Sequence, residues 1–408
     1  MVDYDPFMEE LRDDPFPIYR ALRRESPVHY LERHDSWALS KFDDVWAAGE
    51  DPATYASPGP ALSTITFEAE EQGGTGQEED ASRTSGIASL FGMNPPQHTA
   101  LRKHLARHFT PKGVARFEPA LRQSVRGFID EFRSIGQADV IGDLGLRVSV
   151  QIACLIIGLP VEDGTQLAGI VSRFFAREPG VEGMPPDALA AAGELQAYLL
   201  DAVREWRRRG FDSENALATY AGVEIDGQLY SDEEIAQHAM ILVVGGTETL
   251  PKVFAGGVLQ LHRHPDQRAQ LVADPSFIPK AFDEIARYEM PTQFLSRTLT
   301  RDVSLRGQTM RAGQGVLFLY RAANRDEEEF EDPERFDIQR RPRRILSFGH
   351  GTHICIGQHA ARLEAKVMYE ELLATIPDYE VVEEDVVLAR SEFVAGYLAM
   401  PIRFRASA

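Results

Sequence analysis

Cysteine is almost absent from this chain, since only Cys154 and Cys355 occur among 408 residues. So few thiols argue against an oxidising, disulfide-forming compartment. Cys154 lies in the apolar run Val150–Ile157 and is predicted to be a buried core residue. Cys355 lies close to glycines on both sides. This setting is unusual for a core cysteine, so a chemical role has to be considered for Cys355.

Positive charge and long apolar runs are also scarce. Lysine and arginine number 43 against 63 acidic residues, which gives a net charge of −20. This balance argues against nucleic-acid partners and against a generally anionic membrane surface. Apolar runs such as Ala239–Val244 and Cys154–Leu159 are far shorter than the roughly 20 residues that span a bilayer. The first ten residues lack a signal-peptide profile. We therefore expect a soluble, cytoplasmic protein with neither nucleic-acid nor membrane partners.

Linkers rich in proline, glycine and serine are missing too, and helical periodicity runs through most of the chain. We therefore expect one domain over residues 1–408, mainly α with a small β region. Strand-like segments are few: they are Val28–Leu39, Thr298–Leu305, Gly315–Tyr320, the region around Val386, and Pro401–Phe404. The least helical stretch, residues 64–86, is predicted to be an acidic, glycine-rich loop. This loop could be a lid over a substrate site or simply a solvated acidic loop, and the sequence leaves both alternatives open.

Helix boundaries can be predicted at three places. Asp14-Pro15 to Arg24 is typical of a short amphipathic helix, and another helix should begin after Pro95-Pro96. Ser231 and Glu234 form a capping box before the apolar run Ala239–Val244. A helix that starts there and reaches about His264 would be roughly 50 Å long, enough to cross the domain.

The most informative segment surrounds Cys355. Residues 348–357 read FGHGTHICIG. Glycine lets a backbone approach a bulky planar partner and adopt turns that other residues avoid. Loop N–H groups and the start of a following helix favour thiolate over thiol, and thiolate is the form that binds metal.

An inert thiol and a zinc cluster are the two alternatives for this loop. A cysteine is more often an inert small hydrophobe than a ligand. A zinc cluster could use four side chains, namely His350, His353, Cys355 and His359. Zinc sites usually show paired ligands at short fixed spacing, and structural ones commonly use two or more cysteines. The zinc alternative does not account for the phenylalanine and the glycines.

The pattern F-x-x-G-x-H-x-C-x-G resembles the haem-binding loop of cytochrome P-450 monooxygenases. The resemblance covers about Asp13 to Phe404, nearly the whole chain. It implies a triangular-prism fold with a mainly helical domain and haem b (iron protoporphyrin IX) as cofactor. Cys355 would then be the axial ligand of the iron, with Phe348, Gly349 and Gly357 as cofactor-binding residues of the loop.

A second motif lies inside the predicted long helix, where residues 245–249 read GGTET. Two glycines in mid-helix cost roughly 1 kcal/mol each relative to alanine. The motif resembles the family signature (A/G)-G-x-(D/E)-T, which implies that Glu248 and Thr249 are catalytic and relay protons to dioxygen. The competing interpretation is a weakened helix with a surface glutamate and a threonine that bonds back to the Gly245 carbonyl.

Pro251 follows this motif and departs from the family, which often has a small hydroxyl residue there. It has no N–H, so the Thr247 carbonyl loses its helical partner. We therefore expect the helix to open or kink at Glu248 and Thr249.

Glu284 and Arg287 lie at i and i+3, a spacing that is common on helix surfaces. Together with Arg335 they resemble the family's Glu-Arg-Arg triad, a buried network beneath the haem. This structural triad would serve folding and haem retention rather than chemistry.

The two haem propionates need cationic partners. The resemblance places four at family positions: His98, Arg102, Arg297 and His353. His98 and Arg102 share one helix face, and Asn94 stands four residues earlier where aspartate is usual. For each residue taken alone, an ordinary surface base is the competing interpretation.

Substrate-pocket positions also follow from the resemblance. They are Ile241, Val244, Gly245, Gln293, Phe294, Phe393 and Val394. Most are apolar, which favours an apolar small molecule such as a terpenoid, steroid, fatty acyl or aromatic compound. The implied reaction, hydroxylation or epoxidation, inserts one atom of dioxygen into that molecule.

Electrons would come from a separate ferredoxin, or flavodoxin, and its reductase, because the chain leaves no length for a fused flavin or ferredoxin domain. We expect a monomer. Cations near the expected proximal haem side would attract an acidic donor: they are Arg102, Lys103, Arg107, Lys112, Arg340, Arg341, Arg343 and Arg344. A peroxygenase, a haem sensor and a zinc-binding structural protein remain alternatives, but the first two would not need Glu248 and Thr249.

Overall fold

The computed structural model describes residues 2–57, 89–177, 184–210, 214–225, 227–389, 391 and 393–407. The acidic, glycine-rich loop predicted over 64–86 lies outside these residues.

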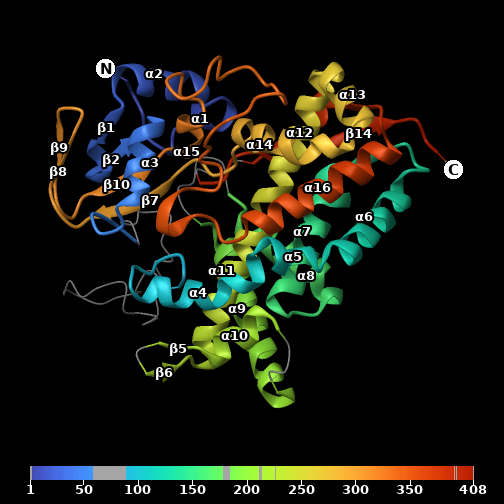
Figure 1. Ribbon diagram of the computed structural model, residues 1–408, viewed down its shortest axis with the longest axis horizontal. Coiled ribbons are helices and arrows are strands. Elements are labelled where there is room, and N and C mark those ends of the chain that lie inside the picture. The colour runs from blue at the N-terminus through green and yellow to red at the C-terminus, as the bar shows by residue number, and fades with distance from the viewer. Residues whose placement is uncertain are drawn as a thin grey trace.

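Helices make up most of the described chain (Figure 1). The α-helices are α1 Glu10–Asp13, α2 Phe16–Glu25, α3 Phe42–Glu50, α4 Gln97–Phe109, α5 Pro111–Ala115, α6 Glu118–Phe132, α7 Leu146–Ile157, α8 Gly164–Phe174, α9 Pro186–Arg209, α10 Ala216–Gly222, α11 Asp232–Thr247, α12 Thr249–Arg263, α13 Pro265–Ala273, α14 Ile278–Tyr288, α15 Tyr320–Ala323 and α16 Gln358–Thr375. A π-helix, η3 Val140–Gly145, leads into α7, and the short 3₁₀ turns are η1 Glu32–His34, η4 Val161–Asp163, η5 Pro275–Phe277, η6 Gly351–His353 and η7 Glu383–Asp385.

The strands are short. They are β1 Val28–Leu31, β2 Ser36–Leu39, β3 Tyr55–Ala56, β4 Gln137–Asp139, β5 Glu224–Ile225, β6 Gln228–Leu229, β7 Leu295–Leu299, β8 Val303–Leu305, β9 Gln308–Met310, β10 Gly315–Phe318, β11 Tyr379–Val381, β12 Val387–Leu388, β13 Tyr397–Ala399 and β14 Pro401–Phe404. The prediction of a mainly α fold with a small β region is confirmed.

The largest sheet has five strands in the order β1-β2-β10-β7-β3. Strand β10 runs parallel to β2 and antiparallel to β7, with Val316 opposite Arg297. This register fixes Arg297, one of the predicted cofactor-binding residues, in the interior strand pair of the sheet.

Helix starts follow the local rules that the sequence obeys. Helix α4 begins directly after Pro95-Pro96, and α2 begins after Pro15. At α11 the Ser231 Oγ accepts a hydrogen bond from the Glu234 N–H at 3.2 Å, and the Glu234 carboxylate accepts one from the Ser231 N–H. The capping box is therefore confirmed.

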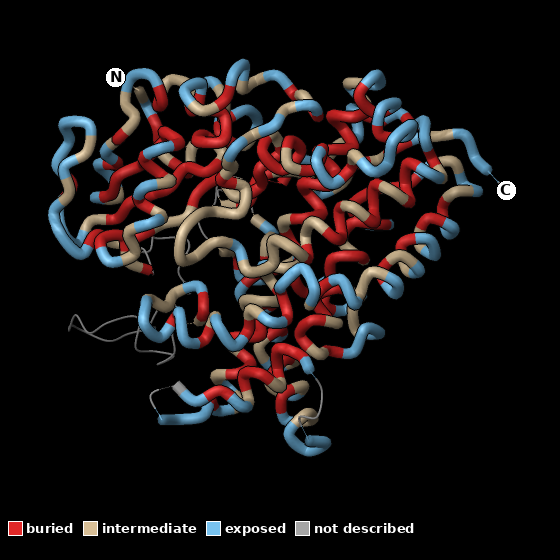
Figure 2. Tube along the Cα trace, in the orientation of Figure 1, coloured by how far each residue is buried: buried red, intermediate tan, exposed pale blue. Residues whose placement is uncertain are grey.

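The outline in Figures 1 and 2 tapers from a broad edge, which holds the five-stranded sheet and α13, to a narrow end at α9 and α10. Buried residues concentrate inside this triangle (Figure 2). Helix α12 is a core helix, because every residue from Leu250 to Leu261 is buried. The cysteine segment 348–357 joins this helical body to the sheet side.

One helical segment, Val140–Ile157, is long and apolar enough to cross a membrane by length and composition alone. This segment corrects the expectation that every apolar stretch is too short to span a bilayer. However, 67% of the segment is buried inside the fold, as in the core helix of a soluble protein. Cys154 lies within it and is buried, as predicted.

Candidate functional site: a cysteine loop, a cluster of bases and a broken helix

The cysteine loop is held by its own backbone. The Cys355 N–H donates to the Phe348 carbonyl at 2.7 Å, and the Gly349 N–H donates to the Leu346 carbonyl at 2.9 Å. Gly349 and Gly351 have φ values of +67° and +71°, which favour glycine. A Cβ at Gly351 would also lie 1.9 Å from the Gly49 carbonyl oxygen of α3. These two glycines are therefore required by turn geometry and close packing.

Opposing effects act on the Cys355 sulfur. The N–H groups of Gly357 and Gln358, together with Arg102, lower the pKa of the thiol, but burial is the larger effect and raises it overall. The expectation that the loop alone would favour thiolate is therefore only partly correct. Although protein atoms surround the thiol densely, Cys355 itself is solvent-accessible, unlike Cys154. An accessible thiol inside a protein is suited to a metal, which deprotonates the sulfur when it binds.

The four predicted propionate partners lie together. The rings of His98 and His353 are 4.2 Å apart between centroids. Burial and the neighbouring Arg102 and Arg297 lower the pKa of His98 to about 4 and that of His353 to about 3. Arg102 and Arg297 come from α4 and β7, and burial lowers their pKa values as well.

This cluster has no acidic partner within the described part of the chain. Both ring nitrogens of His98 and the Nε2 of His353 are buried without a hydrogen bond there. Arg102 donates to the Ile354 carbonyl and Arg297 donates to the Ser296 carbonyl, and neither pairs with a carboxylate of a described residue. Four buried or half-buried bases that lie together without an anion fit a ligand with two carboxylates, and haem b is such a ligand.

The zinc alternative does not match the geometry. His350 stacks on Trp46 with ring centroids 3.3 Å apart, and its Nε2 lies 2.8 Å from Glu50 Oε1. His353 instead lies against His98. Among the residues described, no group of three or more His, Cys, Asp or Glu side chains is placed to hold a metal ion.

The long helix is broken where the proline rule predicts. Helix α11 ends at Thr247 and α12 begins at Thr249, with Glu248 between them at φ −96° and ψ −39°. The predicted opening at this point is confirmed. Ile241, Val244 and Gly245 lie on one face of α11, at the i, i+3 and i+4 positions. Gly245, in the last turn of α11, is exposed, and a Cβ there would meet nothing within 4 Å.

The side chains at the break rule out the competing interpretation of this motif. Glu248 is only 7% exposed, so it is not a surface glutamate. Thr247 bonds back along the helix, to the Val243 carbonyl at 2.8 Å. The Thr249 hydroxyl is half-buried, and no described residue forms a hydrogen bond with it.

A further residue, Lys252, joins the site without having been predicted. Its Nζ donates a hydrogen bond to Glu248 Oε1, and Lys252 is 5% exposed. Burial raises the pKa of Glu248, while Lys252 and then Arg177 oppose that rise. The i, i+4 spacing of a glutamate and a lysine was a sequence signal for this pair.

The Glu-Arg-Arg network differs from the prediction in one member. Glu284 and Arg287 form two hydrogen bonds, at 2.7 and 2.8 Å, and both side chains are fully buried. The third arginine is Arg340, whose Nε lies 3.2 Å from Glu284. Arg335 is exposed and contributes only its carbonyl, which accepts from Arg287 and Arg340. The predicted Arg335 is therefore replaced by Arg340, because the chain turns its side chain outward at that position.

Two predicted pocket residues are occupied by protein contacts. Gln293 Oε1 accepts from the Tyr19 hydroxyl at 2.9 Å, and its Nε2 donates to the Ser391 carbonyl at 3.2 Å. Phe294 is 1% exposed and belongs to the apolar cluster of the N-terminal helices. The structure thus assigns Gln293 and Phe294 to the core, because α2 packs over the segment that leads into β7.

Phe393 and Val394 lie on the loop beside that segment. The Phe393 carbonyl accepts a hydrogen bond from the Gln293 N–H at 3.0 Å, and its ring meets Phe294 edge-on at 6.3 Å. Val394 is buried and forms an isolated bridge with Thr292. Of the two, only Phe393 is half-buried.

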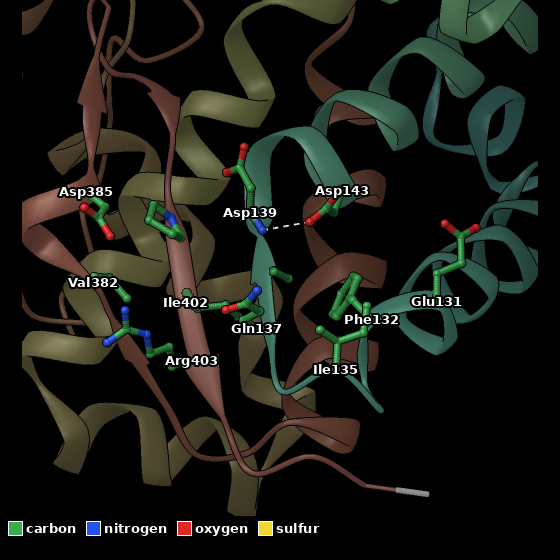
Figure 3. A pocket seen from close by; sticks show the side chains of 12 residues that line it. Glu131, Phe132, Ile135, Gln137, Asp139, Asp143, Val382, Asp385, Ile402 and Arg403 are labelled. Atoms are coloured by element: carbon green, nitrogen blue, oxygen red, sulfur yellow. Dashed lines mark hydrogen bonds between the residues drawn. The ribbon is translucent and has the colours of Figure 1, made fainter.

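A cavity of about 460 Å³ elsewhere in the molecule shares no residue with this site. It lies between the end of α6, β4 and β14 (Figure 3). Two of its carboxylates accept from the backbone: Asp143 accepts from the Asp139 N–H at 2.8 Å, and Asp139 accepts from the N–H groups of Ile141 and Met400. This cavity is therefore a structural junction of the C-terminal sheet.

Comparison with known proteins agrees with the geometry. The family model described as cytochrome P-450 matches residues 194–377. The chain is 35% identical over 396 residues to cytochrome P-450 130 of Mycobacterium tuberculosis, covering 96% of this chain and 95% of that one. It is also 31% identical to a methyl-branched lipid omega-hydroxylase of Mycobacterium tuberculosis, covering 98% and 93% of the two chains.

Solved structures show the same fold. A Bacillus megaterium cytochrome P-450 in complex with testosterone superposes with a TM-score of 0.84 at 27% identity, covering 98% of this chain and all of the other. A second cytochrome P-450, in complex with an acyl carrier protein ligated to hexadec-9Z-enoic acid, has a TM-score of 0.84 at 25% identity and covers 97% and 99%.

The fold and the site thus define a haem-dependent monooxygenase. The chain belongs to the cytochrome P-450 family, is an oxidoreductase and uses haem b as its cofactor.

Proposed function

We propose that the Cys355 thiolate would hold the haem iron and that His98, Arg102, Arg297 and His353 would hold the haem propionates. The observation that carries this assignment is the cluster of bases without an acidic partner among the described residues, next to an accessible thiol. When bound, the haem supplies the dioxygen chemistry of the family. Phe348, Gly349 and Gly357 shape the loop around the sulfur.

The chain's own residues have two tasks in the reaction. Glu248 and Thr249 move protons toward the oxygen site from the break between α11 and α12, where a buried carboxylate lies beside a hydroxyl without a described partner. The face of α11 with Ile241, Val244 and Gly245 keeps water out and contacts the substrate. We expect Phe393 to contact the substrate as well.

The substrate is an apolar, lipid-like small molecule, which is hydroxylated or epoxidised. The apolar face of α11 supports this class, and so do the lipid hydroxylase and the testosterone and fatty-acyl complexes among the relatives. A direct test titrates testosterone and hexadec-9Z-enoic acid into the ferric protein. A shift of the Soret band on addition of either compound would report binding beside the haem, and a protein that responds to neither compound would argue against this class.

Electrons come from a separate acidic ferredoxin and its reductase. Four exposed cations near α4 and the cysteine loop form no ion pair with described residues: they are Lys103, Lys112, Arg341 and Arg343. Such a surplus on a chain of net charge −20 favours encounter with an acidic protein.

The assignment of Cys355 is tested by the carbon monoxide difference spectrum of the reduced protein. The wild-type protein should show the red-shifted Soret band of a thiolate-ligated haem. Cys355→Ala should lose it, whereas Cys154→Ala should keep it, because burial raises the pKa of Cys154 to about 12 and holds that thiol away from any ligand. Persistence of the band in Cys355→Ala would overturn the assignment.

A further inference from the structure

Glu248 and Lys252 form a buried ion pair at the break between α11 and α12. Glu248 is 7% exposed and Lys252 is 5% exposed, and Lys252 Nζ donates to Glu248 Oε1. Holding two charges out of water costs free energy that one ion pair repays only in good geometry. An ion pair at this position is therefore expected to have a functional role in addition to any contribution to stability.

The stem of Lys252 is fixed by a neighbouring loop. Gly396 has a φ of +125°, which favours glycine, and a Cβ at that position would lie 2.9 Å from the Cβ of Lys252. The Ala389 N–H donates to the Gly396 carbonyl at 2.8 Å, which anchors this end of the loop. The same loop carries Phe393 and Val394, and Lys252 contacts this loop through Gly396 and Glu248 through its Nζ.

We propose that Lys252 is a positioning residue that holds the Glu248 carboxylate at the helix break, and that Gly396 of the neighbouring loop keeps Lys252 in place. This inference rests on the proposed role of Glu248 in proton transfer. Lys252 acts through Glu248, to which its Nζ donates.

The electrostatic surroundings of Glu248 support this role. Burial raises the pKa of Glu248, and two cations oppose it: first Lys252, from α12, and then Arg177, which follows α8. From α7 and η3, the groups that lie against this turn are Ala153, beside Gly246, and Gly145, beside Pro251, and both are uncharged. A proton relay works best when its pKa lies near the working pH, so the lysine offsets the rise that burial imposes.

The first test measures the titration of Glu248 by infrared difference spectroscopy of the ferric holoenzyme. The carboxylic C=O band that disappears in Glu248→Gln identifies the group. Lys252→Met should raise the midpoint of that band by roughly one to three pH units, because an opposite charge at this range shifts a carboxyl by that amount. Lys252→Arg keeps the charge and should stay near the wild-type midpoint.

Two matched variants control this measurement. Lys41→Met removes another buried lysine, which pairs with Asp326 at 2.6 Å outside the site, and should leave the midpoint unchanged. Gly396→Ala should raise the midpoint in the same direction as Lys252→Met, because the added methyl group displaces the lysine. Gly313→Ala places alanine at a φ of +87° where nothing lies within 4 Å, and should not shift it. An unchanged midpoint in Lys252→Met overturns the role of Lys252, and an unchanged midpoint in Gly396→Ala overturns that of the loop.

A second test separates this inference from the proposed proton relay. If the relay uses Glu248, Glu248→Gln lowers the product formed per NAD(P)H consumed with a compound identified in the Soret titration. Lys252→Met should then lower the same ratio in the wild-type background but not further in Glu248→Gln. Failure of Glu248→Gln to change the ratio would refute the relay alone. A loss in Glu248→Gln without any loss in Lys252→Met would refute the positioning role alone.

Discussion

Buried charged side chains in this protein fall into two kinds. Most are paired, as Lys41 is with Asp326 and Glu284 is with Arg287. The bases around His98 and Arg297 are buried without an acidic partner in the described residues. Since a buried arginine without an acidic partner is costly, Arg297 and the histidines beside it indicate the place where an anionic ligand binds.

Thr249 provides the most direct test of the proton relay. Thr249→Ala should leave substrate binding nearly intact and divert electrons to hydrogen peroxide, because protons no longer arrive at the correct atom. We expect the product formed per NAD(P)H consumed to fall several-fold, which a coupled assay with peroxide detection would measure. Thr247→Ala is the matched control, because that hydroxyl is engaged with the Val243 carbonyl. An unaltered ratio in Thr249→Ala would remove this residue from the relay.

Substitution of Arg340 and substitution of Arg335 should have different effects on stability. Arg340→Ala removes one of two arginines from the buried Glu284 and should destabilise the protein by about 2–4 kcal/mol and speed haem loss. Arg335→Ala should change stability by less than about 0.5 kcal/mol, because alanine keeps the carbonyl that Arg335 contributes. Urea unfolding and haem transfer to apomyoglobin would compare the two variants. If both variants lost stability and haem equally, Arg335 would belong to the triad as predicted.

At the scale of elements, the junction of α11 and α12 links local sequence to chemistry. Pro251 removes one helical hydrogen bond, and its ring packs against η3, where a Cβ at Gly145 would lie 3.3 Å from the Pro251 Cα. The break interrupts the helix at the turn that contains Glu248 and Thr249. A straight helix would hide the same groups within its hydrogen-bond ladder.

Pro251→Ala should therefore restore part of the helix and lower catalytic coupling. The Thr247 carbonyl would regain its N–H partner, so the protein should gain stability and lose an acceptor for water beside the oxygen site. A crystal structure of the variant and its product-to-NAD(P)H ratio are the two measurements. Normal coupling with an unchanged turn would show that the proline is only tolerated there.

Helices α16 and α7 are joined by a buried acid that the reaction does not use. Ser149 Oγ donates to Glu364 Oε2 at 2.7 Å, and burial raises the pKa of Glu364 from 4.5 to about 8. The unfolded chain loses this proton near its ordinary pKa while the folded protein keeps it. Stability should therefore be greatest below the unfolded value and fall as the pH rises toward about 8.

Glu364→Gln would test this linkage. The variant has no proton to lose, so its stability relative to wild type should improve by roughly 1–3 kcal/mol between about pH 5 and about pH 8. Chemical unfolding across this range gives the difference directly. A constant difference between the two proteins would mean that Glu364 is ionised in the fold.

For the molecule as a whole, charge is distributed unevenly. Its net charge is −20, yet several cations near the cysteine loop are exposed. Not all predicted cations are available: Arg344 binds Glu329 and Asp43, and Arg107 donates to Thr219. Arg343 and Lys103 are exposed and form no ion pair with described residues.

The rate of reduction by an acidic ferredoxin should fall steeply with salt. Arg343→Glu and Lys103→Glu should each raise the apparent Michaelis constant for ferredoxin several-fold without changing substrate binding. Arg405→Glu, in the exposed C-terminal segment, makes the same charge change elsewhere and should have little effect. Stopped-flow reduction over a range of ionic strengths measures these effects. A rate that is insensitive to salt would place the docking surface elsewhere.

The sequence by itself determined the family, the cysteine loop, the capping box of α11 and the break at Glu248. Each of these follows from local rules, because glycine, proline and capping residues act within a few positions of the chain. The grouping of His98, Arg102, Arg297 and His353 also came from motifs at family spacing. The prediction of a single domain over residues 1–408, of a monomer and of a cytoplasmic location stays a prediction.

Only the tertiary structure decided which side chains meet. Arg340 rather than Arg335 reaches Glu284, and Gln293 turns toward Tyr19, because the direction of a side chain depends on elements distant in sequence. The role of Lys252 likewise needed Gly396, which is 144 residues further along the chain and packs on the lysine stem. Local sequence rules determine where helices and turns begin and end, but burial and long-range packing determine which side chains contact one another.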